Sequence, residues 1–154
     1  MRSGLLLPHP ACRLCGRRGR RGCAARVVGV EPEGAPSMAL SVASGQAEWC
    51  KEGGKTETIA HGLAPPFAGR ACFHHVRQFV DEVVTVSDDE MRAATRALFR
   101  AGVVAEVSGA AAVAAVLAGK LGDVSGQHVV CTVSGRNIEA DEYEHALSER
   151  PMAH

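Results

Sequence analysis

Polar residues capable of holding a ligand follow each of the short apolar runs in this 154-residue chain. They are Glu31, Ser87, Glu106 with Ser108, and Ser134 with Asn137. Each stands at or just after a run rich in β-branched residues, with the length of a buried strand. The carboxyl ends of parallel strands meet at one edge of a sheet, and ligands bind outside that edge. The pattern therefore predicts a ligand site built from carboxylate, hydroxyl and amide groups.

The segments that must position these residues alternate between strands and helices. Strands are predicted at 26–30, 82–86, 103–107 and 128–133. Helices are predicted at 37–44, 72–80, 88–101, 109–117 and 140–147, with a helical turn at 58–63. Ser87 with Glu90 forms a capping box, and Ser108 is expected to cap the helix that follows it. This order predicts an α/β fold, a three-layer αβα domain around a mostly parallel sheet.

Composition favours a single globular domain. Hydrophobic residues make up 46% of the chain and aromatic residues only 4%, so the core must consist of Ala, Val and Leu. No apolar run approaches the roughly 20 residues that cross a bilayer, so no membrane contact is expected. The six cysteines lack the spacing of a disulfide framework. A reducing, cytoplasmic location is therefore expected.

Residues 1–25 differ from the rest of the chain and are expected to be disordered. Seven of the 17 Lys+Arg lie within the first 26 residues, whereas all 17 Asp+Glu follow them. The cysteines at 12, 15 and 23 lack a fourth ligand at zinc spacing, so free thiols are favoured over a zinc site. Nucleic-acid binding is not favoured either, because no aromatic residues interleave the arginines. Prolines and glycines also argue against a mitochondrial presequence.

Between Val27 and Asn137 the chain contains, in order, VVGVEPEGAPSM, TIAHGLA, FVDEVVTVSDDEM, VAEVSGAAAVAAVLAGKL and VVCTVSGRNIE. Together these phrases resemble the C-terminal half of the threonine/serine dehydratase (ammonia-lyase) family. That family includes serine racemase and belongs to the tryptophan synthase β-like superfamily of pyridoxal 5′-phosphate (PLP) enzymes. The resemblance implies that residues 26–150 form a truncated large domain of a fold-type II PLP enzyme.

The resemblance also implies a set of cofactor-binding residues. Ser134 matches the serine of the family's SGGN phrase, which donates a hydrogen bond to the pyridine nitrogen of PLP, and Asn137 closes the same phrase. Glu106 matches the glutamate of EPSG, close to the ring. Gly62 matches the glycine of TIADG, whose backbone comes near the cofactor. The chain departs from the pattern at Arg136, where the family has a second glycine with greater backbone freedom.

A structural divalent cation is a further implication of the resemblance. Glu31 and Ala35 match positions where relatives bind a cation through a carboxylate and a backbone carbonyl. The third ligand in those relatives is an acid, and Ser37 stands there in this chain. One carboxylate with weak oxygen partners makes a poor Mg²⁺ or Ca²⁺ site, so cation binding is not favoured.

The family's Schiff-base lysine and glycine-rich phosphate loop have no match in this sequence. Lys51, Lys55 and Lys120 do not align with that lysine. The chain is therefore expected to be a fragment of a threonine/serine ammonia-lyase, inactive alone, from a truncated or frame-shifted gene. The intact enzyme would deaminate an amino-acid substrate, threonine or serine, by β-elimination. Two alternatives are a non-catalytic partner of a dehydratase paralogue and an active split enzyme with a separate N-terminal half. A homo-oligomer is also compatible with the sequence.

Overall fold

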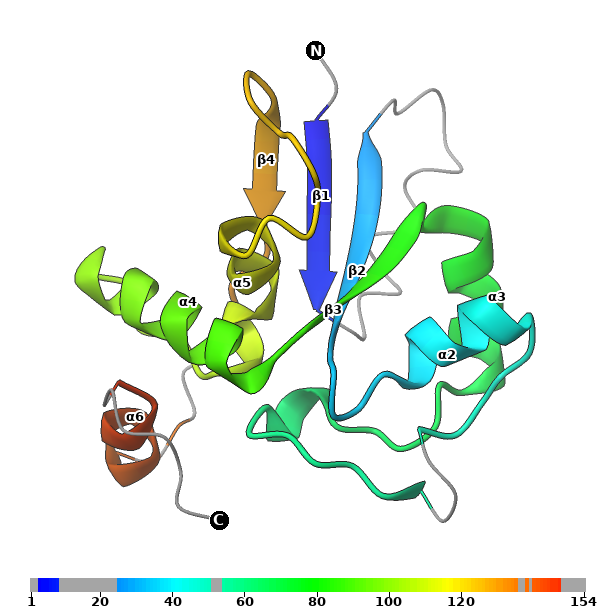
Figure 1. The fold of residues 1–154 in the computed structure, drawn as a ribbon, viewed down its shortest axis with the longest axis horizontal. Coiled ribbons are helices and arrows are strands. Elements are labelled where there is room, and N and C mark those ends of the chain that lie inside the picture. Colours follow the sequence, from blue (N-terminus) through cyan, green and yellow to red (C-terminus); the bar gives the residue numbers. More distant parts are fainter. Residues whose placement is uncertain (1–2, 9–24, 51–53, 136–137, 139, 148–154) are drawn as a thin grey trace.

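A computed structural model describes residues 3–8, 25–50, 54–135, 138 and 140–147 of the chain (Figure 1). Its strands are β1 (Ser3–Pro8), β2 (Arg26–Pro32), β3 (Glu82–Val86) and β4 (His128–Cys131). Its helices are α2 (Ser37–Ser44), α3 (Arg70–Phe79), α4 (Asp88–Arg100), α5 (Ala111–Leu117) and α6 (Ala140–Leu147). Two short 3-10 turns, η2 (His61–Leu63) and η3 (Ser108–Ala110), complete the set.

The four strands form one parallel sheet in the order β3-β2-β1-β4. All pairings in it are parallel, with Leu5 opposite Val27 on one side and opposite Val130 on the other. The chain steps from β1 to β2 and β3, and then returns across the sheet to β4 (Figure 1). The direction of the connections therefore reverses between β1 and β4. In open α/β sheets, ligands bind outside the carboxyl ends of the strands at such a switch point.

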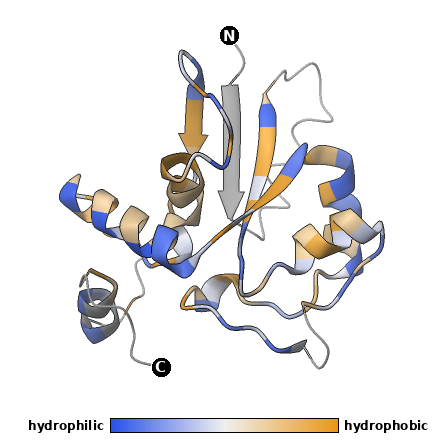
Figure 2. Cartoon of the chain, viewed as in Figure 1, coloured by the Kyte–Doolittle hydropathy of each residue, from blue (hydrophilic) through white to orange (hydrophobic). Residues whose placement is uncertain are grey.

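Helices cover both faces of the sheet, which confirms the three-layer α/β fold. On one face, α5 packs across β1, β2 and β3, and Val84 and Val86 join the larger core cluster with it. Val83 alternates to the other face and packs with Phe73 of α3 and Met38 of α2. Figure 2 shows the strands β2, β3 and β4 as largely hydrophobic bands. Near-continuous apolar strands are typical of parallel sheets that are buried on both faces.

The helix boundaries follow from local chemistry. Pro36 stands at the N-cap of α2, and Gly45 ends the helix with φ 81°, a left-handed conformation that favours glycine. At α4, the Ser87 hydroxyl accepts the Glu90 N–H while the Glu90 carboxylate accepts the Ser87 N–H. The start and end of α2 and the start of α4 match the sequence-based prediction.

The structure differs from the sequence-based expectation in three places. Ser3–Pro8, within the stretch 1–25 expected to be disordered, forms the central strand β1, while residues 9–24 lie outside the described residues. Residues 103–107 form no strand; the Val103 N–H instead closes the end of α4 on the Leu98 carbonyl. Ser108 does not cap a helix, because its hydroxyl accepts a hydrogen bond from the distant Gly62 N–H.

Among the helices that the structure describes, none combines the length and the apolar character needed to cross a membrane.

The Ser87 cap gives a direct stability test. Ser87→Ala removes the acceptor for the Glu90 N–H, so the free energy of unfolding should fall by about 1 kcal/mol. Ser87→Thr keeps a hydroxyl at the same position and should retain most of that stability. Urea denaturation of the three proteins measures the difference, and equal midpoints for Ser87→Ala and the parent would contradict the assignment.

Candidate functional site

The loop after β4 is locked against the turn that starts α5. Gly109 lies so close to Ser134 that a Cβ atom there would overlap the Ser134 carbonyl oxygen. The Glu106 N–H donates to the Gly135 carbonyl oxygen at 3.0 Å. Gly135 itself has φ 76°, and a Cβ there would overlap the Glu106 side chain. These contacts hold Ser134 and Glu106 next to each other at the carboxyl end of β4.

Gly62 joins this group from a separate part of the chain. Its backbone N–H donates to the Ser108 hydroxyl at 3.0 Å, which ties η2 to η3. A Cβ atom on Gly62 would lie 3.5 Å from Glu106 Oε1. The structure therefore brings together Gly62, Glu106 and Ser134, the three residues that the sequence placed in one site. The fourth, Asn137, lies outside the described residues, and the cofactor-binding role of all four stays a prediction.

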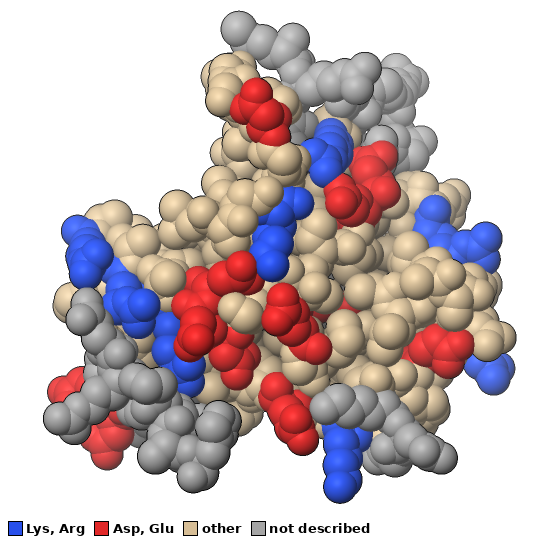
Figure 3. Space-filling model, in the orientation of Figure 1, with Lys and Arg blue, Asp and Glu red and all other residues tan. Residues whose placement is uncertain are grey.

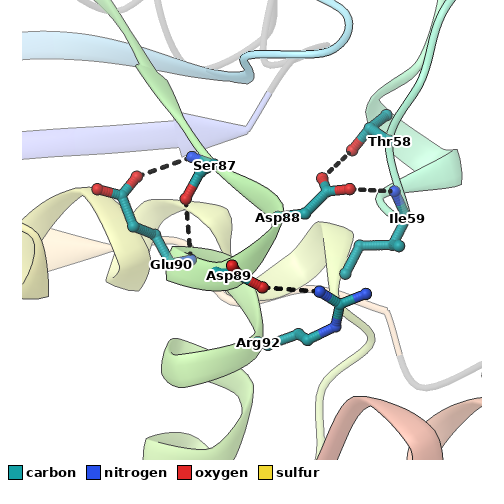
Figure 4. A network of polar contacts seen from close by, with 7 residues as sticks. All are labelled: Thr58, Ile59, Ser87, Asp88, Asp89, Glu90 and Arg92. Carbon is teal, nitrogen blue, oxygen red and sulfur yellow. Dashed lines mark hydrogen bonds and ion pairs between the residues drawn. The ribbon is translucent and has the colours of Figure 1, made fainter. Parts of the chain in front are cut away.

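Asp88, the first residue of α4, holds the segment that carries Gly62 (Figure 4). Its carboxylate accepts the Thr58 hydroxyl at 2.6 Å and the Ile59 N–H at 3.1 Å. The Thr58 hydroxyl oxygen in turn accepts the Ala60 N–H. We refer to residues 58–63 as the strap. Asp88 fixes the start of the strap, and Ser108 fixes its end through Gly62.

Sequence reasoning missed both of these positioning roles. Asp88 stands inside the Ser87–Glu90 capping box and looks like one more acidic residue in the first turn of a helix. Its partners in the strap are 29 and 30 residues away, and Gly62 is 46 residues from Ser108. No local sequence pattern predicts contacts between residues so far apart in the chain.

Glu31, a predicted cation ligand, is used for another purpose in the structure. Its side chain is buried, and its carboxylate oxygens accept the Met38 N–H at 2.9 and 3.0 Å and the Ala39 N–H at 2.8 Å. It thus satisfies the first turn of α2, where a negative charge is favourable. Burial raises the pKa of the Glu31 carboxyl, and the N–H bonds from Ala39 and Met38 oppose that rise.

Ala35, the other predicted cation ligand, is fully buried and donates its N–H to the Pro32 carbonyl oxygen. Within the described residues, no group of three or more His, Cys, Asp or Glu side chains is placed to hold a metal ion. The cation site that the resemblance implies at Glu31 and Ala35 is not tested by this arrangement, because a backbone carbonyl can also be a ligand.

Acidic side chains gather near the middle of the face shown in Figure 3. Two of the molecule's glutamates engage Lys120, whose Nζ lies 3.1 Å from Glu90 Oε1 and 3.7 Å from Glu33 Oε1. The hydrogen bond that Lys120 donates to Glu90 is the main cause that raises the pKa of Lys120. Lys120 is therefore held as a charged ion-pair partner, which is the wrong state for a nucleophilic amine.

Comparison with known proteins decides the family. A family model described as "Pyridoxal-phosphate dependent enzyme" matches residues 15–135. The chain belongs to this family. The match begins inside the stretch 1–25 that we expected to lie outside it.

The relatives are dehydratases and related enzymes. This chain is 40% identical over 125 residues to L-threonine ammonia-lyase of Thermotoga maritima. The match covers 80% of the chain and 30% of the relative. It is 39% identical over 116 residues to the catabolic L-threonine dehydratase TdcB of Escherichia coli. This match covers 74% of the chain and 34% of that relative. The chain thus spans about a third of the curated relatives' length.

Solved structures agree on the fold. A T.th. threonine deaminase superposes with a TM-score of 0.76 at 27% identity, covering 88% of this chain and 47% of that one. Maize serine racemase superposes with a TM-score of 0.76 at 26% identity. The superposition covers 94% of this chain and 45% of the racemase. The PLP-enzyme fold is therefore present in part.

Removal of the Asp88 carboxylate should release the strap. In Asp88→Ala, the Ile59 amide loses a charged acceptor, so its hydrogen exchange should accelerate by about tenfold or more. The Gly62 amide should follow, because the strap then loses its hydrogen bonds to Asp88 and keeps the one to Ser108. Hydrogen-exchange mass spectrometry of residues 58–63 measures this.

Asp89→Ala is the matched control for the strap experiment. Asp89 is in the same helical turn but is largely exposed and pairs with Arg92 (Figure 4). It should leave exchange in the strap unchanged. Equal effects of the two substitutions would show that the strap responds to the helix as a whole and not to the Asp88 carboxylate.

Glu31 should make stability depend on pH. Because its pKa is raised in the folded state above the ordinary 4.5, the native protein binds this proton more tightly than the unfolded chain. The contribution of Glu31 to the free energy of unfolding is thus fully present below the ordinary pKa. It is lost as the pH rises through the raised pKa of the folded state. Glu31→Gln removes this dependence.

Urea denaturation in steps from about pH 4 to about pH 7 measures the effect. The free energy of unfolding of the parent, minus that of Glu31→Gln, should fall as pH rises. Glu144→Gln, at an exposed position of α6, is the control for the effect of the same substitution elsewhere in the chain. A difference that is constant with pH for Glu31→Gln would be evidence against a raised pKa.

Proposed function

We propose that this chain supplies one wall of a PLP site that deaminates a hydroxy amino acid, threonine or serine, by β-elimination. The observation that carries the proposal is the convergence of Gly62, Glu106 and Ser134 at the carboxyl edge of the sheet. That edge is also the switch point between β1 and β4, where the fold itself favours a ligand. The named relatives that act on threonine support the reaction class.

The residues present fit the ring edge of the cofactor. Ser134 is exposed, so its hydroxyl is accessible to a ring nitrogen. Gly62 lacks a side chain where one would crowd Ser108 and Glu106. The missing side chain lets η2 lie directly against η3, and Gly62 itself is exposed.

Each residue would have a distinct task. PLP supplies an electron sink for the substrate's α-carbon when it is bound. The Ser134 hydroxyl would hold and orient the ring nitrogen, and as a neutral partner it would leave that nitrogen largely unprotonated. Glu106 is fixed beside it by the contact of its N–H with Gly135. The strap would place the Gly62 backbone against the cofactor.

Catalysis is proposed to need a second part of a family polypeptide. The chain spans 30% to 37% of the length of three of its curated relatives. In the family, the reacting lysine and the phosphate loop come from portions to which this sequence has no match. Alone, this chain is therefore proposed to bind PLP weakly and not to release a keto acid. The second candidate is a non-catalytic partner of a dehydratase paralogue, which the same incompleteness favours.

Titration with PLP, followed by absorbance and fluorescence, tests the proposal. A lost hydrogen bond is worth about 1 kcal/mol, so Ser134→Ala should weaken binding by about fivefold. Ser125→Ala, at an exposed serine before β4, should bind as the parent does. Threonine added to the same samples should give no 2-oxobutanoate.

Three results would contradict the proposal. Equal affinity of Ser134→Ala and the parent would remove Ser134 from the site. If the parent shows no saturable binding of PLP, the proposal that this chain supplies one wall of a PLP site is wrong. Keto-acid release by the chain alone would show that it is a complete enzyme.

A further inference from the structure

The loop after β4, which carries Ser134, lies between two elements that can hold it. On one side, the Glu106 N–H donates to the Gly135 carbonyl oxygen and ties the loop to the turn before α5. On the other side the chain enters α6, and only four residues separate Gly135 from Ala140. The five steps from Gly135 to Ala140 span about 18 Å at most. The position of α6 therefore limits where the loop can lie.

α6 packs on α4 through one face of the helix (Figure 1). Ala146 is buried, at 3% exposure, in the core cluster to which α4 and α5 contribute. One turn earlier in α6, the Tyr143 ring stands edge-on to the ring of Phe99, with the ring centroids 5.9 Å apart. α6 has only eight residues, and an isolated helix of that length is marginal in water. Its helical form therefore depends on this docked face.

The same side of α4 encloses two polar atoms without a partner. Within the described part of the chain, neither the buried Tyr143 hydroxyl nor the buried Nε of Arg92 has a hydrogen-bond partner. Arg92 precedes Phe99 by seven residues, or two helical turns, so both lie on one side of α4. A buried donor without a partner favours any state in which water reaches it. The two atoms thus work against the apolar contacts that hold α6 in place.

We propose that α6 is a weakly docked clasp, and that its docking on α4 sets the order of the loop after β4 and the PLP affinity of the site. This rests on the proposed function, because Ser134 lies in that loop. When α6 is released, the loop keeps its contact at Gly135 and loses the support of the helix. Only the docked fraction of molecules then holds Ser134 in place, and the apparent affinity for PLP falls in proportion to that fraction.

Tyr143→Phe tests whether docking is weak. The substitution keeps the ring beside Phe99 and removes the hydroxyl that has no partner. α6 should then open less often, so its amides should exchange about fivefold more slowly than in the parent. Hydrogen exchange of the full chain, followed by NMR without PLP, measures this. Equal or faster exchange in α6 would show that the hydroxyl does not oppose docking, which overturns the proposal.

Ala146→Asp tests the link between α6 and the loop. It places a charge at a buried position of the docked face, so α6 should be released. The Glu106 amide, which donates to Gly135, should exchange at least about tenfold faster, and PLP should bind at least about tenfold more weakly. Ala93→Asp is the matched control, because it makes the same change at an exposed position of α4 itself. It should leave α6, the Glu106 amide and the PLP affinity as in the parent.

Thermal melting establishes that the variants fold, and each outcome then decides the matter. If Ala146→Asp releases α6 but leaves the Glu106 amide and the PLP affinity unchanged, the clasp is wrong and the proposed function stands. If Ala146→Asp does not fold, Tyr143→Phe decides by the same amide. Slower exchange of Glu106 together with α6 supports the clasp, and unchanged exchange of Glu106 overturns it. A parent that binds no PLP contradicts the proposed function, whereas the exchange measurements judge the link from α6 to the loop without PLP.

Discussion

The contact between Gly109 and Ser134 is the constraint on which the candidate site depends. The backbone of η3 and the loop after β4 approach so closely that any side chain at Gly109 would displace the Ser134 carbonyl. The hydrogen bond from Glu106 to Gly135 lies directly beside this contact. Two segments that are distant in the sequence therefore meet through main chain, with no side-chain layer between them. The position of Ser134 is thus set by backbone geometry, which is stiffer than side-chain packing.

The first turn of α4 connects this contact to the strap. Ser87 and Glu90 satisfy each other's N–H groups, which leaves the Asp88 carboxylate free to bind outside the helix. Negative charge is favourable at this end of a helix, where the Asp88 carboxylate accepts two hydrogen bonds from the strap. The capping box and the clamp on the strap are therefore parts of one arrangement. It sets the position of Gly62 relative to Ser108 through the strap.

The sequence predicted those parts of the fold whose signals are local. The capping box of α4 and the ends of α2 follow from residues within one helical turn, and both are confirmed. The prediction of a strand at 103–107 was wrong, because an apolar run can also close a helix and enter a turn. β1 was missed because the arginine-rich stretch that follows it dominated the interpretation of residues 1–25. Asp88 and Ser108 act over 29 residues or more, where no spacing rule applies.

The exposure of the site bears on how one wall could hold a cofactor. Small-molecule sites normally bury 70% or more of their ligand. Gly62, Ser134 and Gly135 all lie exposed at the carboxyl edge of the sheet, and Glu106 is only half-buried. A ring placed against these residues would keep its other face in water, and the hydrogen bond from Ser134 would compete with solvent.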